Sequence, residues 1–332
     1  MVFILKSWVL IAVIAYFFHA ATSIIDKFLL EKRISRPSTY AFWVGIFGIF
    51  ALLLTPFGFF TPALKELLLA IFSGFLSVLA FYSFFVILQK SEASRIAPVI
   101  GGFSPIFVLL LSRIFLGESL EWMEFAAFLF LIAGGVLISF AIRVDGIHPV
   151  KSQTPEASAD PQAGRTSNGV HIQKPETQKI FFVTMLSAFL FALTYVLFKA
   201  ATNHTPFINA FIWSRLGGFA AAFLFLFTKA SRSDILNSPR LQALTSTGAL
   251  FMLNKFLGAA GFFLLDYAIS IGRVSIINAM QGVEYTLIFI FAVILSRKYP
   301  NILREDFGRL AFYQKSIGIA LVVLGLALLA LG

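Results

Sequence analysis

Long apolar runs, each close to the length of a membrane span, recur along all 332 residues of the chain. A helix needs roughly 20 mostly apolar residues to cross the hydrocarbon core of a bilayer. Ten runs satisfy this requirement, and polar links separate them. We therefore predict an all-α membrane protein with ten transmembrane helices, at residues 8–29, 40–60, 66–88, 95–116, 122–142, 180–200, 207–228, 245–268, 274–296 and 313–331.

One link differs from the others. Residues 143–178 are rich in Pro, Ser, Thr, Gln and Gly and almost free of apolar side chains. This composition is typical of a flexible tether without a packed core. We predict a flexible linker that joins a first five-helix repeat, residues 1–142, to a second, residues 179–332.

The two halves share short blocks of sequence in the same order. SFFVILQKSEASR at residues 83–95 aligns without a gap with GFFLLDYAISIGR at residues 261–273. Such self-similarity indicates duplication. Because each half has an odd number of helices, the halves must insert with opposite orientation, which predicts two inverted five-helix repeats.

The distribution of charge predicts the orientation. Hydrophobic residues make up 59% of the chain and charged residues 13%, with a net charge of +10. The links after the odd-numbered helices hold 19 Lys and Arg residues and the opposite side 5. Cytoplasmic loops carry the excess of positive charge. We expect an integral membrane protein of a prokaryotic inner (plasma) membrane, with the linker in the cytoplasm, both termini outside and no nucleic-acid partner.

The ninth predicted helix carries an unusual polar stripe. Asn278, Gln281 and Glu284 lie three residues apart in the apolar run at residues 272–296. On a continuous helix this spacing puts all three on one face, which must look at protein or water rather than lipid. We therefore place the candidate site beside this face.

Ionisable residues inside the second half extend the candidate site. Arg215, Lys255 and Glu284 lie at depths that agree within about 5 Å along their predicted helices, and Asp266 lies nearer a helix end. A charge at this depth must be paired or face an aqueous cavity. We predict that Glu284 pairs with Lys255 or Arg215 in a central cavity, where Asn254, Asn278 and Gln281 supply hydrogen bonds. The alternative is an ion pair that only locks the helices together.

The fourth predicted helix carries helix-breaking residues instead of charges. Pro98, Gly101, Gly102 and Pro105 lie within two turns of each other. A proline inside a helix removes a hydrogen bond and kinks the backbone, which frees carbonyls to face a cavity. We predict a gate or kink here; the alternative is a kink filled by a neighbouring helix.

Motifs of enzymes are absent from the sequence. The chain has no cysteine, its four histidines are scattered, and no Gly-rich phosphate loop occurs. We expect no metal, no cofactor and no catalytic site. The acidic residues Glu118, Glu121 and Glu124 are interpreted as capping the fifth helix and meeting water rather than binding a metal.

The sequence resembles the EamA-type domain of the drug/metabolite transporter superfamily. The similarity lies in RIAPVIGGFSPIFVLLLSRIFLGE at residues 95–118 and AGGVLI at residues 133–138, with Lys199, Pro206 and Arg215 in the second half. The second half departs from the pattern, having Val283 opposite Pro105 and no terminal Gly-Glu. The resemblance implies a ten-helix transporter. Many members of this family keep both termini in the cytoplasm, opposite to the orientation that the charges predict.

The function that follows is secondary transport. We expect a small polar or amphipathic metabolite, such as an amino acid, to cross by alternating access, with proton coupling through Glu284 as one mechanism that the sequence allows. The cations Arg215 and Lys255 favour a solute with a carboxylate. Alternatives are a nucleotide-sugar or lipid-linked sugar carrier and a non-transporting membrane scaffold. The expected partners are a small-molecule solute, membrane lipid and, as an option, a second copy in a homodimer.

Overall fold

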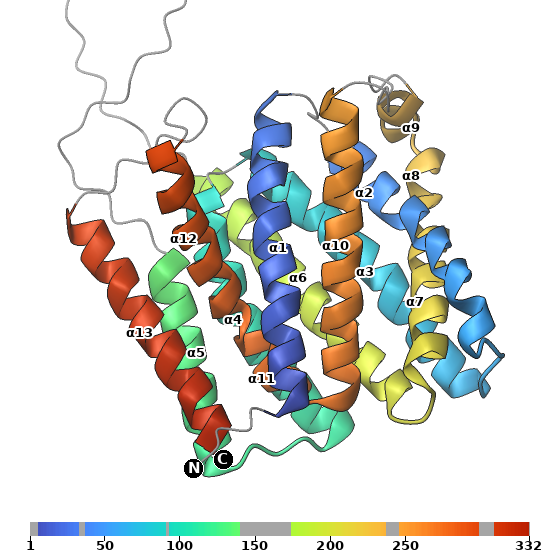
Figure 1. Ribbon diagram of the computed structural model, residues 1–332. Helices are drawn as coiled ribbons and strands as arrows, with labels where there is room; N and C mark the ends of the chain where they lie inside the picture. Colours follow the sequence, from blue (N-terminus) through green and yellow to red (C-terminus); the bar gives the residue numbers. More distant parts are fainter. Residues whose placement is uncertain are drawn as a thin grey trace, which may run out of the picture.

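The computed structural model of the chain describes residues 6–32, 37–90, 93–139, 174–236, 246–298 and 309–331. Every regular element in these residues is a helix, and ten stretches are long and apolar enough to cross a membrane. The predicted fold class is thereby confirmed: the protein is an all-α integral membrane protein. Figure 1 shows the helices side by side as one bundle.

Seven of the ten spans consist of a single α-helix. These are α1 (Ser7–Lys32), α3 (Leu64–Lys90), α4 (Ala93–Leu116), α5 (Trp122–Ser139), α6 (Lys174–Thr202), α10 (Ser246–Ile271) and α13 (Arg309–Leu331). The helix α6 begins inside residues 143–178, so the predicted linker is wrong in its last five residues, which are helical. The linker residues before 174 lie outside the described residues.

The other three spans are interrupted. The second span consists of α2 (Pro37–Phe47) followed by a 3₁₀ helix, η1 (Gly48–Phe57). The seventh consists of α7 (Phe207–Ala222) and the single turn α8 (Leu224–Phe227), after which the short helix α9 (Lys229–Leu236) follows. The ninth is divided into α11 (Val274–Ala279) and α12 (Gln281–Lys298). Hydropathy predicted these spans but not their interruptions.

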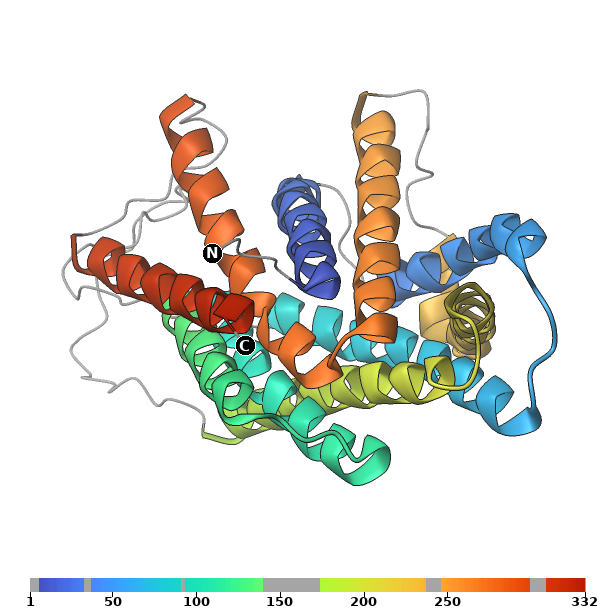
Figure 2. The same cartoon turned by 60° about the horizontal axis from the view of Figure 1, so that its bottom comes forward.

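The bundle is arranged around α1. In Figures 1 and 2, α1 lies between α10 on one side and α12 on the other, and it packs against both. Behind these three helices, α3 packs along α6 and α7, and α4 packs along α6. The beginning of α1 and the end of α13 lie at the same end of the bundle (Figure 1).

Glycines allow α3 and α7 to touch through their backbones. A Cβ atom at Gly74 would lie 1.6 Å from the carbonyl oxygen of Ser214, and one at Gly217 would lie 2.1 Å from that of Ile71. Any larger side chain would push the helices apart, because real Cβ atoms never approach so closely. This contact fixes α7, and with it Arg215, against the first half of the chain.

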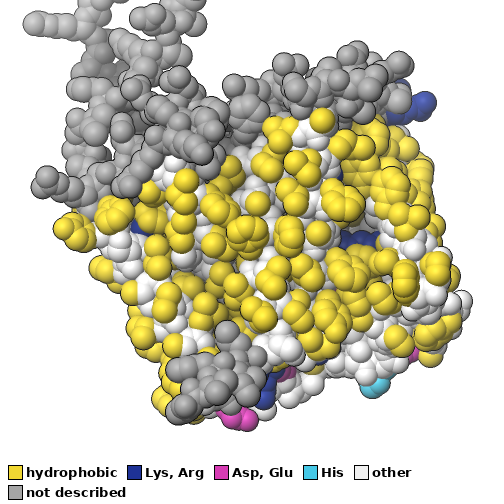
Figure 3. Space-filling view, in the orientation of Figure 1, with side chains coloured by type: hydrophobic (Ala, Val, Ile, Leu, Met, Phe, Trp, Pro, Cys, Tyr) yellow, Lys and Arg dark blue, Asp and Glu magenta, His cyan; other side chains and the backbone are white. Residues whose placement is uncertain are grey.

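Apolar side chains cover the face of the bundle in Figure 3. Among the described residues, Leu53, Phe57, Phe227 and Phe256 have exposed fractions above 70%. An apolar belt of this kind is what a lipid-facing surface requires. The same view shows cationic atoms at the bottom of a hollow in this belt.

Candidate functional site

Polar side chains form a column along α1. Tyr16, His19, Thr22, Ser23 and Asp26 are separated by three or four residues, or adjoin, so they lie along one side of the helix. The helices α10 and α12 flank this side. Most polar contacts between α1 and other helices involve residues of this column. The first half of the chain therefore contributes more polar groups to the interior than the prediction assigned to it.

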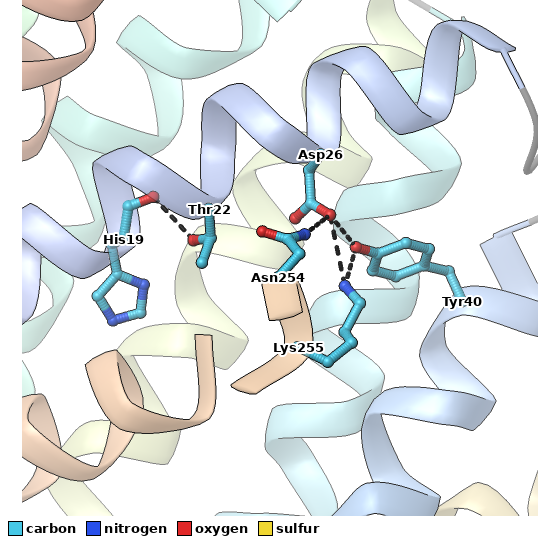
Figure 4. A network of polar contacts seen from close by, with 6 residues as sticks. All are labelled: His19, Thr22, Asp26, Tyr40, Asn254 and Lys255. Atoms are coloured by element: carbon cyan, nitrogen blue, oxygen red, sulfur yellow. Dashed lines mark hydrogen bonds and ion pairs between the residues drawn. The ribbon is translucent and has the colours of Figure 1, made fainter. Parts of the chain in front are cut away.

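Asp26 is the centre of a network of three helices, shown in Figure 4. Its Oδ1 atom accepts a hydrogen bond from Asn254 Nδ2 at 2.6 Å and lies 3.4 Å from Lys255 Nζ. The Tyr40 hydroxyl contacts both Asp26 and Lys255, and the Lys255 ammonium lies 4.0 Å from the centre of the Tyr40 ring. This network joins α1, α2 and α10.

A second ion pair joins α7 to α10. The Arg215 guanidinium contacts the Asp266 carboxylate, whose side chain is only 9% exposed. The Phe211 ring lies 4.6 Å from the guanidinium carbon. Burial makes such a pair strongly dependent on both partners, because either charge alone would be left unsolvated.

Arg215 and Asp266 line a small pocket between α3, α6, α7 and α10. The remaining lining is divided between hydroxyl groups and aromatic rings: Ser73, Ser77, Thr194, Ser214, Phe81, Phe191, Tyr195, Phe198 and Phe262. A guanidinium presents five donors in a planar fork that matches a carboxylate. The pocket thus combines an anion-recognising group with apolar walls and small hydrogen-bonding groups.

The predicted pairing of Glu284 with Lys255 or Arg215 is wrong. Glu284 instead accepts a hydrogen bond from the Ser23 hydroxyl at 3.1 Å. The two cations contact Asp26 and Asp266. The reason is lateral position: α1 lies between α12, which carries Glu284, and α10, which carries Lys255 (Figures 1 and 2).

The stripe of Asn278, Gln281 and Glu284 is divided by the interruption of the ninth span at Met280. Asn278 is buried in α11 and accepts a hydrogen bond from the Ser104 hydroxyl of α4, while Glu284 belongs to α12 and contacts α1. The Tyr16 hydroxyl donates to the carbonyl oxygen of Ile277 at 2.7 Å. The prediction of one continuous polar face is therefore wrong, although Asn278 and Glu284 do face protein.

The fourth span is one helix without an interruption, and the gate or kink predicted there stays a prediction. The helix α4 is continuous through Pro98 and Pro105, and the Pro98 side chain lies outside the described residues. A Cβ atom at Gly101 would lie 2.7 Å from the Tyr285 ring, and one at Gly102 would lie 3.1 Å from Val136. These glycines allow close packing, while the actual break occurs in the corresponding helix of the second half.

Charged groups also gather where α5 begins. The Glu124 Oε2 atom accepts a hydrogen bond from the Glu121 backbone N–H at 3.1 Å, which confirms the predicted cap. The expectation that Glu124 meets water is wrong, since its side chain is 6% exposed and its Oε1 atom lies 3.1 Å from Arg273 Nε and 3.7 Å from Lys6 Nζ.

The first half of the chain matches a known protein family. Residues 6–140 match the profile of the EamA-like transporter family. These residues are an EamA domain. The predicted resemblance to the drug/metabolite transporter superfamily is thereby confirmed, and the EamA domain ends with α5, just before the predicted linker.

A solved structure described as "Crystal structure of protein" has the same overall fold as the full chain. It is 17% identical, with a TM-score of 0.64, over 97% of this chain and 96% of that chain. At this identity the likeness extends to the fold. No curated protein sequence matches the chain. The EamA domain and the ten spans together show a membrane protein whose first half matches the EamA-like transporter family.

Sequence reasoning missed Asp26 and Tyr40, which complete the Lys255 network. Asp26 lies near the end of a predicted span and Tyr40 at the start of the next, where polar residues are ordinary. The spacing of His19, Thr22 and Asp26 was the available signal, because it repeats at three and four residues. A cation inside a span, as at Lys255, indicated that an acidic partner was needed but not where it lay.

Proposed function

We propose that the protein is a secondary transporter, and not an enzyme, that moves a small solute with a carboxylate across the membrane by alternating access. The observation that carries this proposal is the position of Arg215. Its guanidinium lies within a membrane span and lines a small pocket together with hydroxyl groups and aromatic rings. Intramembrane charges beside a cavity are by default groups of a transport path.

The ion pair gives Arg215 a way to exchange partners. In the structure, Asp266 neutralises Arg215. A solute carboxylate that enters the pocket competes with Asp266 for the guanidinium, while the aromatic walls take up the apolar part of the solute. An amino acid is one compound of this class, because the hydroxyl groups and Asp266 can receive its ammonium group.

The packing of the two halves supports alternating access. The sixth span, α6, comes five places after α1, and the eighth, α10, five places after α3. Each pair therefore occupies corresponding places in the proposed inverted repeats, residues 1–142 and 179–332. The helix α3 packs along α6 and also along α7. Its counterpart α10 packs along α1, and its Lys255 contacts Tyr40 of α2. Exchange of these two arrangements would open the opposite end of the path.

The proposal includes the placement of the chain in its membrane. The excess of positive charge in the links after odd-numbered helices supports a cytoplasmic linker and external termini in a prokaryotic plasma membrane. Glu284 lies within a span and is a candidate group for proton coupling.

A thermal-shift screen of the purified protein against amino acids, other carboxylates, sugars and nucleotides tests the solute class. We expect stabilisation by a carboxylate and its loss in Arg215→Gln, because a ligand that binds only the folded state raises the melting temperature. Uptake into proteoliposomes with and without a pH gradient then tests coupling in the wild type and in Glu284→Gln. Stabilisation by nucleotide sugars alone would favour the alternative carrier.

A further inference from the structure

A cluster of charged and polar groups joins several helices at the end of the bundle where α1 begins. Arg273 is its central cation: the Nε atom lies 3.1 Å from Glu124, and an Nη atom donates to the backbone carbonyl of Ser119. Nearby, the Ser275 hydroxyl donates to Glu118 at 2.9 Å, and Lys6 approaches Glu124 at 3.7 Å. Figure 3 shows acidic and basic side chains at this end of the molecule.

The cluster connects the two halves of the chain. Four of its residues belong to the EamA domain. Lys6 precedes α1, Glu118 and Ser119 lie in the link before α5, and Glu124 lies in the first turn of α5. Arg273 and Ser275 belong to the junction of α10 and α11 in the second half. The helices that these groups join can separate at this end only if the contacts break.

The cluster is mechanically connected to the interrupted ninth span. Arg273 directly precedes α11, all six residues of which are buried. The break at Met280 follows, and then Glu284, which lies about 16 Å along the span from Arg273 if each residue rises 1.5 Å. A movement of α11 at the cluster therefore changes the position of α12 relative to α1.

A neighbouring contact holds the adjacent helix ends. Lys199 Nζ, in the last turn of α6, donates to the carbonyl oxygen of Ser270 at the end of α10, at 2.9 Å. The pocket beside Arg215 is lined by both of these helices. The pocket is thus separated from this end of the bundle by helix ends that polar contacts hold together.

The exposure of the charges suits reversible contacts. Glu124 is 6% exposed, whereas the Arg273 and Lys6 side chains are 34% and 39% exposed. Cations that already meet water lose little hydration in the pair, so no buried cation is left when the contacts break, and Glu124 keeps its hydrogen bond from the Glu121 N–H. In the pair of Arg215 and Asp266 the cation is less exposed, since the exposed fractions of the two side chains are 23% and 9%.

We propose that the cluster formed by Lys6, Glu118, Ser119, Glu124, Arg273 and Ser275 is a gate that closes this end of the transport path, with Arg273 as its central residue. The inference rests on the proposed transport function. In the structure the gate is closed, and it opens when α11 moves away from the start of α5.

The absence of cysteine from the chain allows a direct test by thiol labelling. Thr194→Cys places one thiol in the pocket, and a membrane-impermeant methanethiosulfonate reagent measures its access to water in proteoliposomes. A separate Trp122→Cys protein identifies the vesicle face that holds this end, because Trp122 is 81% exposed at the start of α5. The reagent is added from that face.

We expect Arg273→Gln, introduced beside Thr194→Cys, to raise the labelling rate by about tenfold, the change that a shift of ~1.4 kcal/mol in a two-state equilibrium produces. Arg113→Gln is the matched control, because Arg113 is an exposed cation in the last turn of α4 at the same end. It should leave the rate unchanged.

An unchanged rate in Arg273→Gln, or an equal rise in Arg113→Gln, would overturn the proposal. If Arg273→Gln does not fold, Lys6→Gln tests the same prediction, with a smaller rise expected at its longer 3.7 Å contact. A Glu118→Cys, Ser275→Cys pair gives a second test: after oxidation and complete blocking of free thiols, the link should abolish transport, and reduction should restore it.

The labelling result and the transport result are independent. Failure to find any transported solute, together with faster labelling in Arg273→Gln, would leave a gated membrane protein and contradict the proposed function. Demonstrated transport with unchanged labelling would retain the transporter and remove the gate.

Discussion

The Ser23 hydroxyl on α1 donates a hydrogen bond to the Glu284 carboxylate on α12, across 3.1 Å. One turn further along α1, Asp26 contacts Asn254 and Lys255 on α10. The first helix therefore holds a helix of the second half on each of its two sides. Its polar column, rather than the stripe on the ninth span alone, organises the polar interior.

Removal of the Ser23 hydroxyl should lower stability because it leaves the half-buried Glu284 carboxylate without this donor. We expect Ser23→Ala to cost about 1.5–3 kcal/mol, the usual range for a hydrogen bond to a charged group. Thermal unfolding followed by fluorescence measures the change. Ser112→Ala is the control, since the Ser112 hydroxyl donates within its own helix to Leu109. An equal loss in both variants would show that Ser23 has no special role.

Arg215 and Asp266 should behave as a coupled pair. We expect Arg215→Gln or Asp266→Asn alone to destabilise the protein by about 3–5 kcal/mol, because each leaves one buried charge without its partner. The double variant should lose less than the sum of the two single variants. A double-mutant cycle of unfolding free energies measures the coupling, and additive losses would contradict the ion pair.

The backbone contact between α3 and α7 should not tolerate a methyl group. Gly74→Ala places a Cβ atom 1.6 Å from the carbonyl oxygen of Ser214, so the two helices must separate. We expect loss of folded protein in size-exclusion chromatography. Gly258→Ala is the control because its nearest neighbour, in Thr22, would lie 3.7 Å away. Normal folding of Gly74→Ala would show that the helices are further apart.

The Tyr40 hydroxyl should contribute to the network around Asp26. Tyr40→Phe keeps the ring beside Lys255 but removes the contacts of the hydroxyl with Asp26 and Lys255. We expect a loss of about 1–3 kcal/mol in the free energy of unfolding. Tyr82→Phe provides the comparison, since Tyr82 is 36% exposed in α3; an equally large loss there would mean that the network is not responsible.

Hydropathy predicted the ten spans because membrane insertion depends on a property that is local in sequence. It did not predict the breaks at Met280 and at the junction of α2 and η1. Near Met280, a tertiary contact satisfies a backbone group that a regular helix would pair internally. The Tyr16 hydroxyl, on α1, donates a hydrogen bond to the carbonyl oxygen of Ile277. The composition of the ninth span contains no signal for that partner.

The sequence predicted which residues form the candidate site better than it predicted which of them contact each other. Arg215, Lys255 and Glu284 were recognised because charges are rare inside spans. Depth along a helix gives the height of a residue in the membrane but not its lateral position. The helices that carry Glu284 and Lys255, α12 and α10, lie on opposite sides of α1 (Figure 2), and the acidic partner of Lys255 came from the first half.

Counterflow in proteoliposomes tests the central claim most directly. Vesicles are loaded with an unlabelled carboxylate solute that stabilises the protein, and entry of the labelled solute is followed in the wild type, in Arg215→Gln and in Arg113→Gln. Exchange by the wild type and by Arg113→Gln, with loss in a folded Arg215→Gln protein, is the predicted result. Absence of exchange in the wild type, or undiminished exchange in Arg215→Gln, would contradict transport of a carboxylate through the Arg215 pocket.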